Sequence, residues 1–427
     1  MRTYSFFSRS YFLQSKPLFR LVAVKQTGNP SSPTAPRAVD DYALLVMLVA
    51  QQRQVSRADL ARLAGLSRST VSLRVDEILK TGLIRESGNG PSTGGRRPVV
   101  LTVNPEAGVV LAADLGATHC HVAAADLAGN ILALQSGGVD MGAGPVAVLN
   151  EILRHCAEVL GSCEKTPSDV LAVGIGIPGP VEFSTGTVVR PPIMPGWDDF
   201  VVSEYIGRSF FVPVVVDNDV NVMALGEYVE RGQRDTSLLF IKVGTGIGCG
   251  IVSHGELHRG LDGAAGDIGH TRLPDHDDTV CACGNTGCLE AVASGGAIVR
   301  QMRAEGRDVQ VTSEVVRLAQ SGDRDVMYRV RRAGEHIGSV LATLVNFYNP
   351  ETIIIGGSLA ALNDDLLAPI RGVVYQRATT LATRRFRLEI TALGWQAGVL
   401  GAVELARRAA LSPDAVGRRL VPAQTET

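Results

Sequence analysis

The sequence of 427 residues contains no run of about 18 consecutive apolar residues, so no segment of it reads as a membrane-spanning helix. Its start also lacks a secretory signal, because Arg20 interrupts the short apolar patch at residues 18–24. Charged residues make up 20% of the chain and apolar residues 45%, which excludes a disordered protein and allows two or three domains with large cores. We therefore expect a cytoplasmic protein with no membrane partner.

The net charge of −2 hides an uneven distribution along the chain. Residues 1–40 hold six basic residues and one acidic residue and end in a Pro- and Ser-rich stretch, which predicts a disordered basic arm. Residues 41–100 hold nine Lys or Arg and five Asp or Glu, whereas residues 101–427 hold 26 and 37. Only the front of the chain can therefore readily approach a polyanion.

Residues 41–103 are expected to form a winged helix-turn-helix domain. Apolar residues at three- and four-residue spacing predict helices that start near residue 41, after Ser56 and after Ser67, with Gly65 breaking the chain between the last two. Two short strands at residues 83–86 and 98–101 flank a Gly-rich loop, which is the pattern of a wing.

The third helix and the wing are expected to contact an operator in double-stranded DNA. Polar side chains in the first half of the third helix lie off its apolar stripe, where a recognition helix meets base edges, and adjacent arginines before a proline suit a narrow minor groove. The alternative is a small helical adaptor with a solvated polar face. The predicted DNA-binding residues are Ser67, Arg68, Ser69, Thr70, Ser72, Arg74, Arg96 and Arg97.

Three of the seven cysteines fall within eight positions, and a histidine lies eleven residues upstream of the first of them. Three thiolates and one imidazole are the ligands that closed structural Zn²⁺ sites prefer. A disulfide fits poorly, because an odd number of cysteines leaves one thiol over. The predicted ligands are His270, Cys281, Cys283 and Cys288; His276 is the alternative imidazole, and reduced thiols in an ordinary loop are the alternative to a metal.

Two units of strand, glycine turn and strand, at residues 109–125 and 238–252, indicate an internal duplication. Amide groups in a glycine turn can bind oxygen anions, although most such turns are ordinary hairpins. A third buried strand, at residues 214–218, ends in carboxylates just before a helix, which is a standard place for a ligand cleft.

The segment Gly266-Asp267-Ile268-Gly269-His270, followed by Cys-x-Cys-x4-Cys-x-Glu, resembles the signature of the ROK family of bacterial repressors, open reading frames and sugar kinases. The Gly-Arg-Arg-Pro segment at residues 95–98 is similar to the wing exit of ROK repressors of the xylose and N-acetylglucosamine types. The resemblance covers about residues 41–410. It implies an α/β domain with the two-lobed, ribonuclease-H-like fold of actin-like ATPases at residues 104–410, with lobes at about 104–225 (plus the C-terminal helix) and 226–395. Residues 411–427 are expected to form a flexible tail.

The same resemblance implies a sugar site and a nucleotide site. The sugar-binding residues would be Asn218, Asp219, Asp267, His270 and Glu290, and Asp219 would be the general base in a kinase. Capping of a helix is the alternative role for the Asn-Asp pair. The nucleotide site, expected to be vestigial and to bind Mg-ATP weakly, would comprise Asp114, Gly116, Thr118, Gly244, Thr245, Gly246, Gly356 and Gly357.

Three departures from the family pattern favour a repressor over a kinase. Ala117 stands where kinases usually have a second glycine, His119 follows the threonine of the first turn, and Asp267 replaces a glutamate, which moves the carboxylate by about 1.5 Å. We therefore expect a sugar-responsive repressor, active as a homodimer or homotetramer, whose effector is a sugar or a sugar phosphate. The alternative is an ATP-dependent hexose kinase that retains a DNA-binding head.

Overall fold

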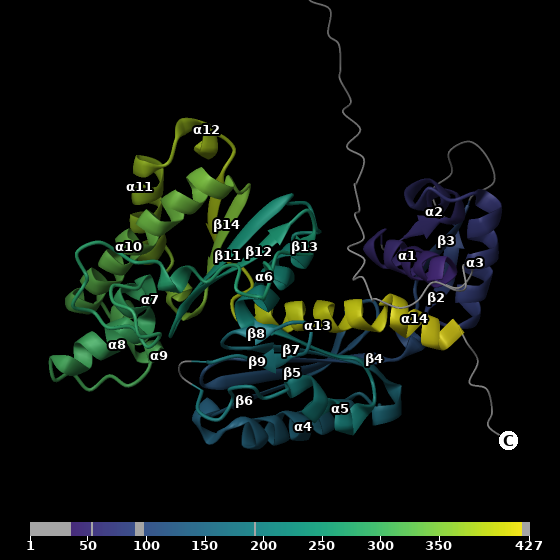
Figure 1. The fold of residues 1–427 in the computed structure, drawn as a ribbon, viewed down its shortest axis with the longest axis horizontal. Helices are drawn as coiled ribbons and strands as arrows, with labels where there is room; N and C mark the ends of the chain where they lie inside the picture. The colour runs from purple at the N-terminus through teal and green to yellow at the C-terminus, as the bar shows by residue number, and fades with distance from the viewer. Residues whose placement is uncertain (1–35, 53, 90–97, 192–193, 421–427) are drawn as a thin grey trace, which may run out of the picture.

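A computed structural model describes residues 36–52, 54–89, 98–191 and 194–420. Figure 1 shows a small N-terminal head and two larger lobes, each built around one sheet. The C-terminal helices run from between the lobes toward the head. Among the described residues, no helix is both long and apolar enough to cross a membrane.

The head consists of three helices and a small antiparallel sheet. Ser56 caps the second helix by accepting from the N–H of Asp59, Gly65 ends that helix with φ +68°, and Ser67 caps the third. The sheet has the order β1-β3-β2. The elements are α1 (Pro36–Gln52), β1 (Val55–Ser56), α2 (Arg57–Ala64), α3 (Arg68–Lys80), β2 (Ile84–Asn89) and β3 (Val99–Val103).

The first helix starts earlier than the sequence indicated. Residues 36–40, which were expected to belong to a disordered arm, form the first turn of α1, and residues 1–35 lie outside the described part of the chain. Proline at the start explains the difference, because its fixed φ suits the first helical position and the hydrogen bond it cannot donate is not needed there.

The first lobe contains a sheet with the order β10-β7-β4-β5-β6. Helices α4 (Pro145–Ser162) and α5 (Val202–Phe210) pack on one face and α13 (Gln396–Ala410) on the other. A short hairpin, β8 (Val181–Glu182) and β9 (Thr187–Val188), lies beside this sheet. The sheet strands are β4 (Val109–Leu115), β5 (His119–Asp126), β6 (Ile131–Gly138), β7 (Val170–Ile177) and β10 (Val214–Asn218).

The second lobe repeats this plan in the order β13-β12-β11-β14-β15. In both sheets the first three strands form an antiparallel meander and two further strands add in parallel beside the first, so the internal duplication expected from the glycine turns is present. The strands are β11 (Ser237–Val243), β12 (Ile247–Ser253), β13 (Glu256–Leu257), β14 (Thr352–Gly356) and β15 (Arg387–Ile390). The helices are α6 (Asp219–Glu230), α7 (Leu289–Ala293), α8 (Gly295–Ala304), α9 (Thr312–Gln320), α10 (Arg324–Tyr348), α11 (Asp364–Arg377) and α12 (Thr380–Thr383).

Helices α6 and α13 form the joint between the two sheets. Their backbones touch at glycines: a Cβ added to Gly226 or to Gly401 would overlap the backbone of the opposite helix. Because β10 leads directly into α6 at Asp219, this close crossing fixes where the start of α6 sits relative to both lobes.

A last helix, α14 (Pro413–Leu420), packs on α1 of the head. The sequence prediction of a flexible tail from residue 411 is wrong for this segment, because Leu411 and Val416 are buried in the same apolar core as the helices of the head. One apolar residue per turn was too weak a periodic signal to reveal it. Residues 421–427 lie outside the described chain.

Candidate functional site

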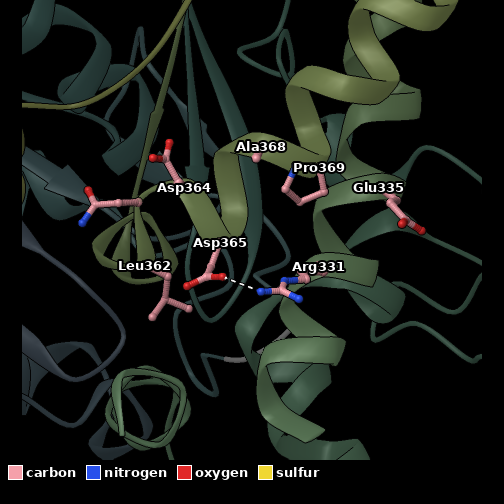
Figure 2. A pocket seen from close by; sticks show the side chains of 8 residues that line it. Arg331, Glu335, Leu362, Asp364, Asp365, Ala368 and Pro369 are labelled. Carbon is pink, nitrogen blue, oxygen red and sulfur yellow. Dashed lines mark hydrogen bonds and ion pairs between the residues drawn. The ribbon is translucent and has the colours of Figure 1, made fainter. Parts of the chain in front are cut away.

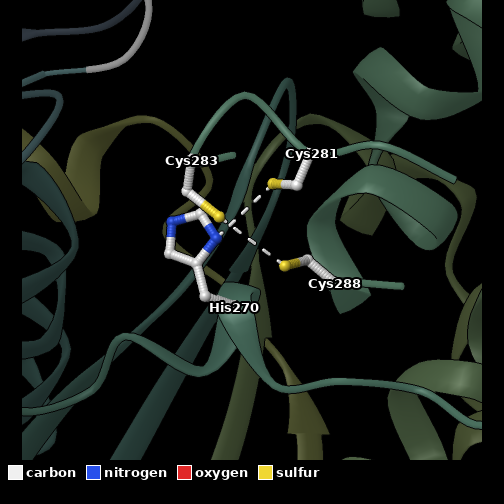
Figure 3. A group of neighbouring side chains, drawn as sticks. All are labelled: His270, Cys281, Cys283 and Cys288. Carbon is white, nitrogen blue, oxygen red and sulfur yellow. Dashed lines mark hydrogen bonds between the residues drawn. The ribbon is translucent and has the colours of Figure 1, made fainter. Parts of the chain in front are cut away.

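Four side chains converge in the loop before α7 (Figure 3). The ligand atoms of His270, Cys281, Cys283 and Cys288 all lie within 4.8 Å of one another. Sγ of Cys283 and Sγ of Cys288 are 3.7 Å apart, and Sγ of Cys281 lies 3.6 Å from Nδ1 of His270. In a tetrahedral site with metal–sulfur distances of about 2.3 Å, sulfurs lie about 3.8 Å apart, so these residues can hold a metal ion.

The three thiols of the cluster differ in their surroundings. Burial raises the pKa of Cys281 and raises that of Cys288 to about 12, whereas a hydrogen bond from the backbone of Asn285 lowers the pKa of Cys283 to about 7. A metal that binds three thiolates therefore has to displace protons. The alternative imidazole, His276, instead packs edge-on against His336 of α10, with the ring centroids 4.8 Å apart.

Glu290 follows the cluster directly and lies in the first turn of α7. Its Oε2 accepts a hydrogen bond of 3.0 Å from the N–H of Ile247, at the end of the second glycine turn. A Cβ added to Gly246 would collide with the same carboxylate. The cluster thus holds a loop that places one carboxylate against the turn between β11 and β12.

The Asn-Asp pair lies at the start of α6. The side-chain oxygen of Asn218 caps this helix by accepting from the N–H of Val220 at 2.9 Å, and its amide group donates to the carbonyl of Gly179 at 2.9 Å. The capping alternative therefore describes the observed contacts of Asn218. Asp219 occupies the first helical position and is 4% exposed.

Arg259 of the second lobe reaches across to the first lobe. Its Nε and a terminal nitrogen lie 2.8 and 2.7 Å from Oδ2 of the buried Asp217, and its guanidinium lies 3.6 Å from the ring centroid of Phe183. The other oxygen of Asp217 accepts from Asn221 and from the N–H of Asn218. This network fixes the strand end that carries Asn218.

A lysine lies at the centre of this region. Lys242 of β11 forms an ion pair with Asp219. Burial disfavours the charged form of Lys242, but attraction to Asp219, Asp114 and Glu290 outweighs it and raises the pKa of its ammonium group. Burial, with repulsion from Asp219, raises the pKa of Asp114 to about 7, although Lys242 acts in the opposite direction.

The residues expected to bind a nucleotide lie at three neighbouring turns. Gly116 and Thr118 belong to the turn between β4 and β5, and Gly244, Thr245 and Gly246 to the turn between β11 and β12. A Cβ on Gly244 would touch Ser358, next to Gly356 and Gly357, so the second and third turns are adjacent. Packing alone also explains why residue 356 is a glycine, because the ring of Phe240 lies against it and leaves no space for a Cβ.

Asp267 is the most exposed of the expected sugar-binding carboxylates. Its side chain is 55% exposed, and Oδ1 lies 3.8 Å from Nε2 of His270. Since Nδ1 of His270 faces Cys281, the two ring nitrogens point to different groups. A carboxylate on the far side of a histidine from a metal is a common arrangement in metal sites, and Asp267 is placed for it.

In the head, the expected DNA-binding residues divide into two groups. Ser67, Arg68 and Ser69 are exposed, while Thr70 and Ser72 are half-buried. Arg74 does not fit the expected role, because it is 18% exposed, forms an ion pair with Asp41 of α1 and lies over the ring of Tyr42. Arg96 and Arg97 lie outside the described residues.

Sequence reasoning missed several residues of this arrangement, and two of them gave a signal. Lys242 is the only charged residue of the otherwise apolar strand β11, and a lone charge in such a strand marks a buried partner. Leu73, on the outer face of α3, is 64% exposed, where a helix that binds nothing would carry a polar residue. Arg259 and Asp217 gave no local signal, because their partners are distant in the sequence.

A separate hollow of about 630 Å³ lies between α10 and α11 (Figure 2). Arg331 and Asp365 form an ion pair of 3.0 Å within it. None of the residues expected to bind sugar, nucleotide, metal or DNA lines this hollow. The hollow therefore does not form part of the site described above.

The sequence of this chain is similar to a known protein family and to repressors. The profile of the ROK family matches residues 110–409. A putative xylose repressor from Caldicellulosiruptor sp. (strain Rt8B.4) is 34% identical over 376 residues, which cover 85% of this chain and 94% of the relative.

Two solved structures share the fold. A ROK family transcriptional regulator, described as a homolog of the E. coli MLC protein, has a TM-score of 0.75 over 90% of this chain and 98% of its own, and at 23% identity this likeness concerns the fold alone. A ROK family glucokinase from Streptomyces griseus, in complex with glucose and AMPPNP, has a TM-score of 0.61 at 30% identity. It covers 70% of this chain and 100% of its own. The fold of the two lobes is thus that of the actin-like ATPases in this group.

Proposed function

The chain belongs to the ROK family, and we propose that it is a sugar-responsive transcriptional repressor whose head binds an operator in double-stranded DNA. The observation that carries the proposal is the extent of the match to the putative xylose repressor. That match covers 85% of this chain, more than the family segment at residues 110–409 or the glucokinase match of 70%. A sugar kinase would not need the additional N-terminal residues.

The form of the head supports DNA binding. Helices α2 and α3, joined by a turn at Gly65, and the strands β2 and β3 have the arrangement of a winged helix-turn-helix. Arg68, Ser69 and Leu73 are exposed on α3, where they can reach base edges and thymine methyl groups in the major groove. In a homodimer or homotetramer, two heads would bind half-sites one or two helical turns apart.

The lobes supply the effector site. We propose that Asn218, Asp219, Asp267, His270 and Glu290 contact the sugar, because they belong to elements that meet between the two sheets. The metal is Zn²⁺ with a structural role: three sulfurs and one nitrogen are its preferred closed ligand set. By holding the loop before α7, it keeps Glu290 at the second glycine turn. The protein acts in the cytoplasm, where its DNA lies.

Binding to a fragment of the protein's own promoter, followed by fluorescence anisotropy, tests this function. Arg68→Ala should weaken binding by about 10- to 100-fold if Arg68 reads a base, or lower the salt dependence by about one unit if it contacts a phosphate. Arg62→Ala is the matched control, since Arg62 is 72% exposed on α2 and pairs only with Asp59. Equal effects of the two substitutions, or release of DNA by none of a panel of sugars, would contradict the proposal.

The second candidate is a hexose kinase with a DNA-binding head. It is favoured by Asp219, a buried carboxylate at the start of α6 in the position expected for a general base. Phosphorylation of glucose by the purified protein in Mg-ATP, abolished in Asp219→Asn, would establish this activity. We expect no turnover above that of the Asp219→Asn variant.

A further inference from the structure

Lys242 has no role in the function proposed above, yet it occupies the centre of the site between the lobes. It belongs to β11, where its neighbours Ile241 and Val243 are fully buried. Its side chain is 23% exposed and pairs with Asp219, which is 5% exposed at its side chain. A lysine is kept in such a place only by partners that compensate for its lost hydration.

Asp114 is a second carboxylate near this lysine, close enough for the two charges to act on each other. It is 5% exposed, and no hydrogen bond to its side chain occurs within residues 36–52, 54–89, 98–191 and 194–420. Its carboxylate lies against the backbone of Gly398 in α13, where a Cβ would collide with it, and close to Gly176. The backbone of α13 therefore closes one side of this carboxylate.

Three amides in or directly after the glycine turns make internal hydrogen bonds. The N–H of Gly116 donates to the carbonyl of His119 at 2.8 Å, and the N–H of Gly244 donates to the carbonyl of Gly246 at 2.9 Å. The N–H of Ile247 donates to Glu290. In addition, the ring of His119 lies directly over Gly116. A Cβ added to that glycine would collide with the ring. These three amides are therefore engaged in internal hydrogen bonds, and the imidazole of His119 covers the first turn at Gly116.

Two observations thus agree that the residues do not fit Mg-ATP. Asp219, which would hold a metal, is paired with an ammonium group, and the imidazole of His119 lies over Gly116 of the first turn. We infer that Lys242 is a built-in cation that replaces a divalent metal between Asp114 and Asp219, and that it makes the site a receptor for an uncharged sugar without nucleotide. This inference rests on the proposed sugar-binding function.

The balance of charge argues against a phosphorylated effector. Five carboxylates, those of Asp114, Asp217, Asp219, Asp267 and Glu290, belong to the site, whereas its cations are Lys242 and Arg259, and both of these are already paired. Phosphate would meet carboxylates with no free cation among these residues. Hydroxyl groups of a sugar, in contrast, can donate hydrogen bonds to the same oxygens.

The metal arm of the test uses Lys242→Met, which keeps the unbranched stem of the side chain and removes its ammonium group. Thermal unfolding of the full-length protein is followed with and without Mn²⁺, Mg²⁺ and Mg-AMPPNP. The original protein should show no saturable stabilisation, whereas Lys242→Met should gain stabilisation by Mn²⁺ that Asp219→Asn removes in the double variant. Lys165→Met, outside the site, is the control for loss of one lysine. Saturable stabilisation of the original protein by Mg-AMPPNP would overturn the inference.

The sugar arm measures binding of D-glucose and N-acetylglucosamine, and of their 6-phosphates, by calorimetry. The uncharged form should bind at least about tenfold more tightly than its phosphate ester. Tighter binding of the ester, lost in Lys242→Met, would make Lys242 a phosphate ligand and overturn the inference. If Lys242→Met does not fold, Lys242→Arg is used instead, because it keeps the positive charge. This variant should exclude Mn²⁺ as the original protein does, and binding of Mn²⁺ by it counts against the inference.

The two proposals fail in distinguishable ways. If D-xylose, D-glucose and N-acetylglucosamine all neither bind nor release operator DNA, the proposed effector function fails, and the metal arm still decides the role of Lys242. If a sugar releases DNA while Mg-AMPPNP binds the original protein, the repressor function stands and the role assigned to Lys242 is wrong.

Discussion

Replacement of Gly401 by alanine tests whether the crossing of α6 and α13 holds the two lobes together. A Cβ on Gly401 would lie 1.7 Å from the carbonyl oxygen of Val222, whereas real Cβ atoms are essentially never closer than 3.0 Å, so the helices have to separate by at least 1.3 Å. The obstacle is backbone, which cannot rotate away. Overpacking of this kind costs about 3 kcal/mol, and the better helix propensity of alanine returns about 1 kcal/mol.

The expected net loss for Gly401→Ala is about 2 kcal/mol in the free energy of unfolding, or a fall in Tm of about 4–8 °C. Gly372→Ala in α11 is the matched control, because nothing lies within 4 Å of the added Cβ and the residue is exposed in mid-helix. This variant should gain about 0.5–1 kcal/mol. Differential scanning fluorimetry of both variants and of the original protein measures the three Tm values. A Gly401→Ala protein that melts at or above the temperature of the original would refute a backbone contact between these helices.

Two further predictions concern the metal and the link between the lobes. Cys288→Ser should contain no bound Zn²⁺ when zinc is measured by mass spectrometry after gel filtration. The control Cys163→Ser, at the end of α4, should retain one equivalent of zinc. Retention of zinc by both variants would disprove the assigned ligand set. Arg259→Met should destabilise the protein by about 1.5–3 kcal/mol in urea titrations and weaken sugar binding, because Asp217 keeps its charge but loses a paired cation. Arg259→Lys should recover part of this loss, and sugar affinity equal to that of the original protein in Arg259→Met would show that the contact does not position the site.

The features that the sequence revealed are those with short-range patterns. The four predicted metal ligands lie within 19 positions of one another, and their spacing alone predicted that these side chains would cluster, as they do in the structure. The helices of the head and the two strand-turn-strand units were likewise legible, because capping residues, glycine turns and apolar periodicity act locally.

The features that the sequence did not reveal depend on pairing between distant residues. Lys242 and Asp219 are 23 positions apart and belong to different elements, so neither strand nor helix periodicity relates them. Arg74 was taken for a DNA ligand because it lies off the apolar stripe of α3, but its partner Asp41 is 33 positions away in α1. A polar residue beside an apolar stripe can face either solvent or a neighbouring helix, and only the packing of the helices decides which.

The contact between α14 and α1 has a consequence for the order in which the protein is made. Val416 is translated after both lobes, yet it completes the apolar core shared with the helices of the head. A nascent chain has therefore long released the residues of its head before it can supply this last piece. Products that terminate before α14 lack it altogether, so full folding of the first domain depends on a segment that is translated long after that domain.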